Sequence, residues 1–263
     1  PSWGRGVLSL TYVLIEKACL PFIDEIIIAE DSYIENYRGR KNIVAIRNYP
    51  ILSYLKAYPG TFSEGVKKTD HSFKVTYVGG ITRLRGALEL VEALRTVKAD
   101  GYQGVKLNLI GSVMPTDLKD ELDGLIQKYS LERDLSIPGP VPHENIFEIL
   151  VQSHIGIAAL HPDPNYVESL PVKLFEYMAA GLPVIASNFP LWKEIVEGNE
   201  CGLTVDPLNP KEIAETIEYL VKHPEERKRM GENGKRAVKE KYNWEQEAKK
   251  LLAVYERLLA KDR

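Results

Sequence analysis

Residues 165–187 read NYVESLPVKLFEYMAAGLPVIAS, and this order of residue types predicts a loop, a helix and a buried strand in quick succession. Ser169 is expected to cap the helix, and Pro171 suits its first turn because proline has no amide hydrogen to lose there. Gly181 supplies the expected stop at the C-terminal end of the helix. The apolar segment 183–187 predicts a short strand buried on both faces, as is typical of parallel sheets.

Two glutamates in this stretch, Glu168 and Glu176, are candidate ligand-binding residues. Glu168 precedes the helix, where unpaired amides and the helix dipole attract phosphate. Glu176 lies inside the helix, about a turn and a half beyond Pro171 at 3.6 residues per turn. This arrangement suits a phosphorylated polyol such as a sugar nucleotide. Taken alone, however, an acidic residue before a helix is more often a dipole partner, and a glutamate in mid-helix is more often solvated.

Strand and helix patterns alternate on both sides of this stretch, which predicts an α/β fold. Strands are expected at 73–81, 105–110, 135–141, 154–160, 183–187 and 201–207, and the helices between and after them at 87–99, 117–128, 144–151, 190–197, 210–222, 224–241 and 244–259. Such alternation with short loops and right-handed crossovers predicts a doubly wound, Rossmann-like parallel sheet. Ligands of such sheets bind beyond the carboxyl ends of the strands, where Gly79, Gly111 and Gly139 fall.

The first seventy residues follow a different pattern. A helix is expected at 7–19, strands at 25–29 and 42–47, and a helical turn at 32–37, while the polar segment 58–70 reads as a loop. These steps are too few to close a six-stranded sheet, so they predict only a partial Rossmann-like segment. The chain begins with proline rather than methionine, which indicates a fragment, a processed product or an excised piece.

Composition excludes several classes of protein. A net charge of −3 gives no signature of binding to nucleic acid. Cys19 and Cys201 lie in apolar surroundings outside any CxxC pattern, so both are expected to be buried reduced thiols. The most apolar segment, 7–20, contains charges and is too short to span a bilayer. His143 and the other histidines show no metal-ligand spacing, so no metal site is expected.

Two further loops are candidates for contact with a ligand. The loop 79–86, GGITRLRG, joins a strand to a helix, and its Arg83 and Arg85 carry donors suited to phosphate oxygens. Both arginines could equally be solvated. The loop 139–142, GPVP, includes Val141 and could be no more than a turn. Lys173 could touch phosphate, but a surface position is the more ordinary expectation for a lysine.

The stretch around Glu168 and Glu176 resembles the E-x7-E region of the retaining glycosyltransferases of family 4, which have the two-domain GT-B fold. Both glutamates, the AAG at 179–181 and the strand at 183–187 match. The resemblance implies that Glu168 is the catalytic residue that reaches the donor hexose, and that Glu176 holds the ribose hydroxyls. It also implies donor contacts from the residues between them at the helix mouth, namely Ser169, Leu170 and Pro171.

The loop 79–86 resembles the family's phosphate-binding loop, whose usual pattern is GR, four residues, then KG. Arg85 occupies the lysine position of that pattern and should contact the donor diphosphate. Gly80 stands where an arginine is expected, and Arg83 is the weaker prediction for a compensating cation. The resemblance further implies that the main chain around Val141 lies against the nucleobase.

The resemblance implies the donor-binding half of a hexosyltransferase that needs no cofactor and no metal. The expected divisions are 1–50 for the end and hinge of an N-terminal domain, 51–71 for a linker, 72–242 for the nucleotide-sugar domain and 243–263 for a helix returning to the N-terminal domain. The donor would be UDP- or GDP-linked and the acceptor a polysaccharide, a lipid-linked glycan or another glycan. Most of the acceptor domain is missing, so weak activity alone is expected, in a cytoplasmic protein with optional peripheral membrane contact.

Two alternatives belong to other classes. The chain could be a non-catalytic or split-gene subunit that pairs with a separate N-terminal-domain protein, which an exposed apolar patch around 7–20 would favour. It could instead be a GT-B relative such as a nucleotide-sugar epimerase, although those enzymes lack the E-x7-E and AAG combination. A turnover assay with donor alone separates the epimerase from the transferase.

Overall fold

The computed structural model describes residues 2–52 and 72–261 of the chain. It divides into two compact units, one formed by Asn48–Gln246 and the other by Pro1–Arg47 together with Glu247–Arg263. The segment 58–70, which the sequence predicts to be a loop, lies outside the described residues.

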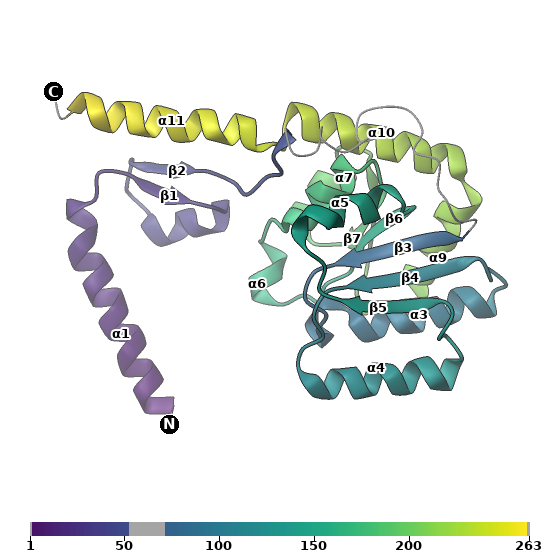
Figure 1. Cartoon of the computed structure of the whole chain (residues 1–263). Coiled ribbons are helices and arrows are strands. Elements are labelled where there is room, and N and C mark those ends of the chain that lie inside the picture. The colour runs from purple at the N-terminus through teal and green to yellow at the C-terminus, as the bar shows by residue number, and fades with distance from the viewer. Residues whose placement is uncertain (1, 53–71, 262–263) are drawn as a thin grey trace. The chain divides into compact units, whose positions relative to one another are not determined.

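The larger unit is built on a six-stranded sheet in which all strand pairs are parallel (Figure 1). Its strands are β3 (Phe73–Val78), β4 (Val105–Ile110), β5 (Leu135–Gly139), β6 (Ile155–Ala158), β7 (Val184–Ser187) and β8 (Gly202–Val205). They lie in the order β5-β4-β3-β6-β7-β8. The first strand therefore lies in the middle and the chain winds outward in both directions, which is the doubly wound arrangement. The predicted α/β fold class is confirmed.

Helices cover both faces of this sheet (Figure 1). They are α3 (Ala87–Ala99), α4 (Thr116–Tyr129), α5 (His143–Val151), α6 (Pro164–Val167), α7 (Val172–Ala179), α8 (Pro190–Val196), α9 (Pro210–Lys222) and α10 (Pro224–Glu240), with a short 3-10 turn, η3 (Arg83–Arg85). Helix α3 packs against α9, and α7 packs against α10. The α6 turn was not expected from the sequence.

Helix α7 begins later than the sequence suggests. Pro171 takes the capping position, and the first helical residue is Val172. Ser169 does not cap the helix, since its hydroxyl donates to the carbonyl oxygen of Tyr166 (3.0 Å). The reason is α6, which turns the chain just before Glu168 and sets Ser169 within a loop.

The C-terminal end of α7 agrees with the prediction. Gly181 adopts a left-handed φ of 74°, a conformation that glycine reaches without a Cβ penalty. Its amide donates to the carbonyl of Met178, and the amide of Leu182 donates to that of Tyr177, both at 3.0 Å. This pair of bonds is the Schellman motif, which satisfies carbonyls left free at a helix end. Strand β7 follows at once, and all of its residues are buried.

The smaller unit contains α1 (Ser2–Cys19), the strands β1 (Ile26–Ile28) and β2 (Ile43–Ala45), and the 3-10 turns η1 (Leu20–Phe22) and η2 (Asp31–Tyr37). The two strands are parallel. Most of α11 (Trp244–Lys261) belongs to this unit, where Arg257 pairs with Glu25 (3.2 Å). The predicted helix, strands and turn of this region are confirmed.

Two sequence expectations about single residues are tested by these elements. Cys19, at the end of α1, is exposed, so its predicted burial is wrong, whereas Cys201 is buried as expected. Asn243 caps α11, because its side-chain oxygen accepts from the amide of Gln246 (3.1 Å). Within the described part of the chain, no helix has both the length and the apolar character needed to cross a bilayer.

Candidate functional site

The candidate site lies at the carboxyl ends of β3 and β6. These two strands are neighbours, and the chain winds away from them in opposite directions, which is the switch point at which doubly wound sheets bind their ligands. The loop after β3 runs through η3 into α3, and the loop after β6 runs through α6 into α7. The candidate residues of both loops therefore face one edge of the sheet.

Glycines let the backbone approach closely at this edge. Gly79 follows β3 with a φ of 129°, and Gly111 follows β4 with a φ of 147°. A Cβ atom on Gly111 would lie 1.9 Å from the carbonyl oxygen of Gly79, which is a severe clash. Both glycines lie at strand ends, as the sequence predicts, and the close approach of the loops after β3 and β4 requires a glycine at position 111.

Arg85 links the loop that follows β3 to the loop that follows β6. The 3-10 turn that carries it is capped by Thr82, whose hydroxyl accepts from the Arg85 amide (3.2 Å). The Arg85 Nε donates to the hydroxyl of Tyr166 on α6 (3.4 Å), and its guanidinium lies 5.8 Å from the centre of that ring. A second, longer contact joins its Nη1 to the carbonyl oxygen of Gly80 (3.5 Å). No carboxylate of the described residues lies within ion-pair distance of it.

Arg83 points elsewhere. Its Nη2 lies 3.0 Å from Asp117 and 2.5 Å from Glu121, both on α4. The hydrogen bond to Glu121, followed by the one to Asp117, raises the pKa of this exposed guanidinium. Its charge is therefore already balanced on the surface of α4, which gives no support to Arg83 as a compensating cation.

The loop from α6 to α7 is held in place from the core. The indole Nε1 of the fully buried Trp192 donates to the carbonyl oxygen of Ser169 (2.7 Å), and Leu170 packs against the core. Glu168 ends α6 with an exposed side chain that has no ion-pair partner among the described residues. A fixed backbone with a free carboxylate is suited to contact with a hydroxylated ligand. Pro171 then leads into α7.

Glu176 is only 15% exposed, unlike an ordinary mid-helix glutamate. Burial raises the pKa of its carboxyl group, and the positive charges of His143 and Lys173 oppose this effect. The Nε2 of His143 lies 3.8 Å from its Oε1. His143 begins α5 directly after the loop that carries the half-buried Val141, so the structure brings this third loop to the same helix. Sequence reasoning considered His143 only as a metal ligand and missed this contact.

Lys173 and Tyr77 are the other residues that sequence reasoning misjudged or missed. Lys173, in the first turn of α7, is partly buried rather than at the surface. Its Nζ donates to the hydroxyl of Tyr77 on β3 (2.9 Å), and that hydroxyl donates to the carbonyl oxygen of Gly80 (2.7 Å). The only sequence signal for this contact was the position of Lys173 between the two glutamates.

Metal-ligand clusters of three or more His, Cys, Asp or Glu residues are absent from the described ranges. His161, in the loop after β6, instead lies 3.1 Å from Glu89 in the first turn of α3. Like the contact of Arg85 with Tyr166, this pair joins the segment that follows β6 to the segment that follows β3.

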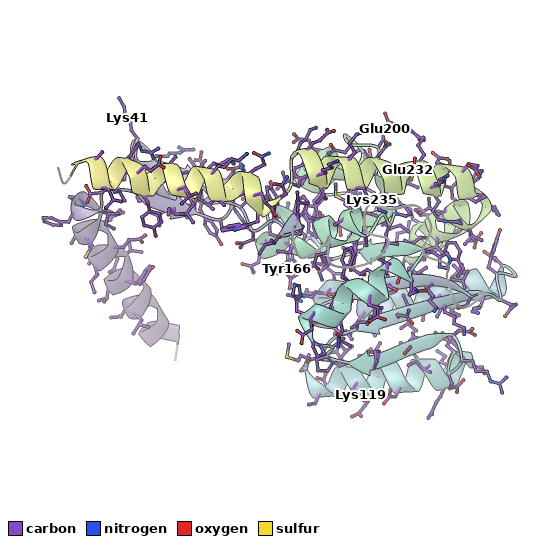
Figure 2. All side chains as sticks on the ribbon, turned by 45° about the horizontal axis from the view of Figure 1, so that its top comes forward. Lys41, Lys119, Tyr166, Glu200, Glu232 and Lys235 are labelled. Carbon is purple, nitrogen blue, oxygen red and sulfur yellow. The ribbon has the colours of Figure 1, made fainter. Side chains whose placement is uncertain are left out.

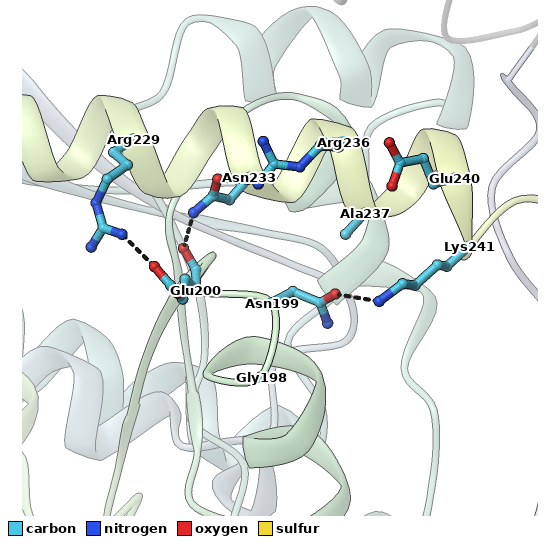
Figure 3. A pocket seen from close by; sticks show the side chains of 9 residues that line it. All are labelled: Gly198, Asn199, Glu200, Arg229, Asn233, Arg236, Ala237, Glu240 and Lys241. Atoms are coloured by element: carbon cyan, nitrogen blue, oxygen red, sulfur yellow. Dashed lines mark hydrogen bonds and ion pairs between the residues drawn. The ribbon is translucent and has the colours of Figure 1, made fainter.

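A separate cavity of about 310 Å³ lies at the opposite edge of the sheet, between α10 and the turn that precedes β8 (Figure 3). It is lined by Gly198, Asn199, Glu200, Arg229, Asn233, Arg236, Ala237, Glu240 and Lys241. Because β8 begins at Gly202, this cavity lies at the amino ends of the strands. Parallel sheets bind their ligands at the carboxyl ends, so we do not place the functional site here.

Comparison with known proteins agrees with this geometry. The family model of the glycosyl transferases group 1 matches residues 61–237. An MMP alpha-(1->4)-mannosyltransferase of Mycolicibacterium hassiacum is 25% identical over 179 residues, covering 68% of this chain and 41% of the relative. An uncharacterized glycosyltransferase of Methanocaldococcus jannaschii is 26% identical over 247 residues, covering 94% of this chain and 58% of the relative. The chain thus spans about half the length of these relatives.

Solved structures share the fold. A glycosyltransferase from Rickettsia africae matches with a TM-score of 0.75 at 20% identity, covering 90% of this chain and 64% of the other. The Anabaena protein HepE, solved in complex with UDP, matches with a TM-score of 0.73 at 18% identity, covering 89% and 64%. With a family model that matches more than half of its length, this chain belongs to the group 1 glycosyltransferases, and its six-stranded parallel sheet is that of a GT-B glycosyltransferase.

Proposed function

We propose that this chain is the donor-binding half of a retaining, metal-independent family 4 glycosyltransferase, which transfers a hexose from a UDP- or GDP-linked donor to a polysaccharide, a lipid-linked glycan or another glycan. The observation that carries this proposal is the meeting of the loops after β3 and β6, where Arg85 contacts Tyr166 just before Glu168. Structures of HepE contain UDP or UDP-glucose, which makes UDP the first nucleotide to test.

In this proposal, negative charge develops on the departing diphosphate and is stabilised by Arg85 and by the free amides at the start of α7. Glu168, exposed at the end of α6, orients the sugar hydroxyls so that the acceptor attacks from the same face as the leaving group. Glu176 accepts hydrogen bonds from the ribose hydroxyls, and the main chain around Val141 lies against the base. Ser169, Leu170, Pro171 and Gly80 shape the floor of this donor site, and Arg83 remains the weakest of the predicted contacts.

Titration calorimetry with UDP and with GDP tests the donor site. We expect one of them to bind, and Glu176→Ala to weaken that binding about tenfold, because two hydroxyl hydrogen bonds to a carboxylate are lost. Glu232→Ala, a change on the exposed side of α10, is the matched control (Figure 2). Equal affinities of the parent and Glu176→Ala would show that the ribose assignment is wrong.

Addition of EDTA should leave the affinity unchanged, and a metal requirement would contradict the proposal.

Transfer activity tests the other part of the proposal. Activity needs an acceptor held opposite the donor, and residues 1–263 span about half the length of the relatives that they match. Purified 1–263 should therefore bind the donor but turn it over slowly. Rapid transfer to a glycan acceptor by this chain alone would contradict the proposal.

A second candidate function is a subunit that pairs with a separate protein, and α1 favours it. Six large apolar side chains of this helix are at least 49% exposed: Val7, Leu8, Leu10, Tyr12, Leu14 and Ile15. Large apolar side chains exposed in such number on one helix favour an interaction site there. Analytical ultracentrifugation of 1–263 and of a variant with Leu8, Leu10 and Leu14 changed to Ser tests whether this surface causes association. Indistinguishable, monomeric behaviour of both would remove the support for this candidate.

A further inference from the structure

Two cations converge on adjacent glycines at the end of β3. A Cβ atom on Gly79 would lie 2.8 Å from Nζ of Lys173, and one on Gly80 would lie 3.1 Å from Nη1 of Arg85. Lys173 comes from α7 and Arg85 from η3, so the two charges reach this point from the segments that follow β6 and β3. Tyr77 lies beneath them, with its ring centre 4.1 Å from Nζ of Lys173.

Neither cation forms an ion pair with another described residue. In the described part of the chain, no carboxylate lies within the 4 Å of an ion pair from Lys173 or Arg85, and their hydrogen bonds go to the hydroxyls of Tyr77 and Tyr166 and to the Gly80 carbonyl. Burial raises the pKa of Tyr77 to about 12, so its phenol stays uncharged at neutral pH. Arg85 and Lys173 therefore repel each other, and Glu176 on the same helix as Lys173 opposes this effect without forming an ion pair with it.

We propose that Lys173 is the second cation of the diphosphate site, which it forms with Arg85, and that it takes up a proton when the diphosphate binds. This inference rests on the proposed function, because it assigns the residue that completes the donor site. It also supplies the positive charge that is absent at Gly80, which stands where the family carries an arginine. Arg83, the obvious substitute in the sequence, is held by two carboxylates of α4.

The proton uptake follows from the groups that face Lys173. Burial, and then the charge of Arg85, lower the pKa of Lys173 to about 7, while Glu176 on the same helix opposes this effect. Of the groups around it, Tyr77 faces Lys173 directly, and His143 on α5 faces Glu176. A bound diphosphate adds negative charge beside Nζ and so raises the pKa of Lys173. The proton comes from the buffer and stays on Nζ in the complex.

The sign of the pH dependence is fixed by this shift. Well below pH 7, Lys173 is protonated before and after binding, so no proton is taken up. Above pH 7 the free protein has a neutral Lys173 and the complex a charged one, so affinity falls as pH rises. Between pH 7.0 and 8.5 a change in affinity reports on the protein, because the last phosphate ionisation of the nucleotide, near pH 6, lies below this range.

Calorimetry with UDP and GDP at pH 7.0 and 8.5, in two buffers of different ionisation enthalpy, measures both affinity and proton uptake. For whichever nucleotide the parent binds, we expect uptake of a substantial fraction of a proton at pH 8.5 and an affinity about tenfold lower than at pH 7.0. Lys173→Met should bind about tenfold more weakly at pH 7.0 and lose both the uptake and the pH dependence. If Lys173→Met keeps the parent's affinity and uptake, the inference is wrong even though the donor site stands.

Lys235→Met is the matched control. Lys235, on α10, has a pKa that is likewise lowered by burial, but it lies against Gly181 at the opposite end of α7 (Figure 2). Its loss should change neither the affinity nor the uptake. An equal effect of both substitutions would show that the loss of any buried lysine perturbs α7, and would overturn the assignment to Lys173.

A second measurement separates failure of this inference from failure of the proposed function. In the parent protein with ¹³C-labelled lysine, the Cε signal of Lys173 at pH 8.0 should move from the neutral to the charged position when inorganic pyrophosphate is added. If pyrophosphate moves this signal but neither UDP nor GDP binds, the anion site stands and the nucleotide-sugar function falls. If pyrophosphate and both nucleotides leave the signal unmoved, Lys173 is not part of an anion site.

Discussion

The carboxyl edge and the amino edge of the six-stranded sheet each gather positively charged side chains. At the amino edge, in the cavity of Figure 3, Arg229 pairs with Glu200 and also lies 3.5 Å from Glu226, whereas Arg236 and Lys241 donate to the amide oxygens of Asn233 and Asn199. At the carboxyl edge, the hydrogen bonds of Arg85 and Lys173 to other described residues go to hydroxyl and carbonyl oxygens. The two edges therefore differ in that Arg229 has carboxylate partners, whereas Arg85 and Lys173 are partly buried and have none at ion-pair distance within the described residues.

This difference indicates which edge binds a ligand. An anion beside Arg229 would have to displace carboxylates that already neutralise its guanidinium. At the carboxyl edge, two partly buried like charges raise the free energy of the empty site, and a diphosphate would lower it. Groups with perturbed pKa values and no structural partner gather at functional sites, because their arrangement is unfavourable without the ligand.

The largest expected effect is the loss of nucleotide binding in Arg85→Ala. A charge-assisted hydrogen bond is worth about 2 kcal/mol, so the affinity for UDP or GDP should fall about thirtyfold. Arg229→Ala, at the other edge, should change it less than twofold. Calorimetry on both variants measures the contrast, and a loss in Arg229→Ala as large as that in Arg85→Ala would move the site to the amino edge.

The next effect is on stability, and it comes from the lowered pKa of Lys173. The unfolded chain holds its proton up to about pH 10.5, whereas the folded chain begins to lose it near pH 7. The unfolded state thus binds more protons between these values, and the free energy of unfolding rises with pH. The contribution of this lysine between pH 7 and pH 9 is about 2 kcal/mol.

Urea unfolding of the parent and of Lys173→Met at both pH values isolates this contribution. The parent should become more stable relative to the variant as pH rises. A constant difference between them would mean that Lys173 keeps an ordinary lysine pKa in the folded protein.

A smaller effect is expected at the amino edge, where Gly181 ends α7. A side chain there must adopt a left-handed φ of 74°, and its Cβ would lie 2.4 Å from the flexible end of Lys235. Gly181→Ala should lower the free energy of unfolding by about 1 kcal/mol and leave nucleotide affinity unchanged. Thermal unfolding and calorimetry measure the two quantities. A matching loss of affinity would show that the two edges are coupled through α7.

The smallest effect is expected for Arg83→Ala. Because Arg83 is exposed and paired with Asp117 and Glu121, its removal should change nucleotide affinity less than twofold. Calorimetry beside Arg85→Ala compares two arginines only two positions apart. A tenfold loss in Arg83→Ala would restore it as the compensating cation and would weaken the assignment to Lys173.

The fold was predictable because its signals are local. Each strand of the large sheet is a short apolar run, and alternation with amphipathic helices specifies a parallel sheet. The end of α7 could be read from Gly181, since a left-handed residue there needs no tertiary context. Its start could not, because the α6 turn and the bond from Trp192 to Ser169 decide where the helix begins.

Residues of the candidate site were predictable only where they match a position of a sequence motif. Glu168, Glu176 and Arg85 occupy motif positions, and the structure places their loops at one edge of the sheet. The partner of Lys173 is Tyr77, 96 residues away in the chain, and no local pattern reports such a contact. The exposure of Cys19 was missed for a related reason, since apolar neighbours along α1 do not show whether anything covers them.

The most direct test of the central claim is a crystal structure of this chain with UDP or GDP bound. We expect the diphosphate to lie between Arg85 and Lys173 at the carboxyl ends of β3 and β6, with the ribose hydroxyls against Glu176. A nucleotide bound instead in the cavity beside Arg229, or a diphosphate that touches neither Arg85 nor Lys173, would contradict this account.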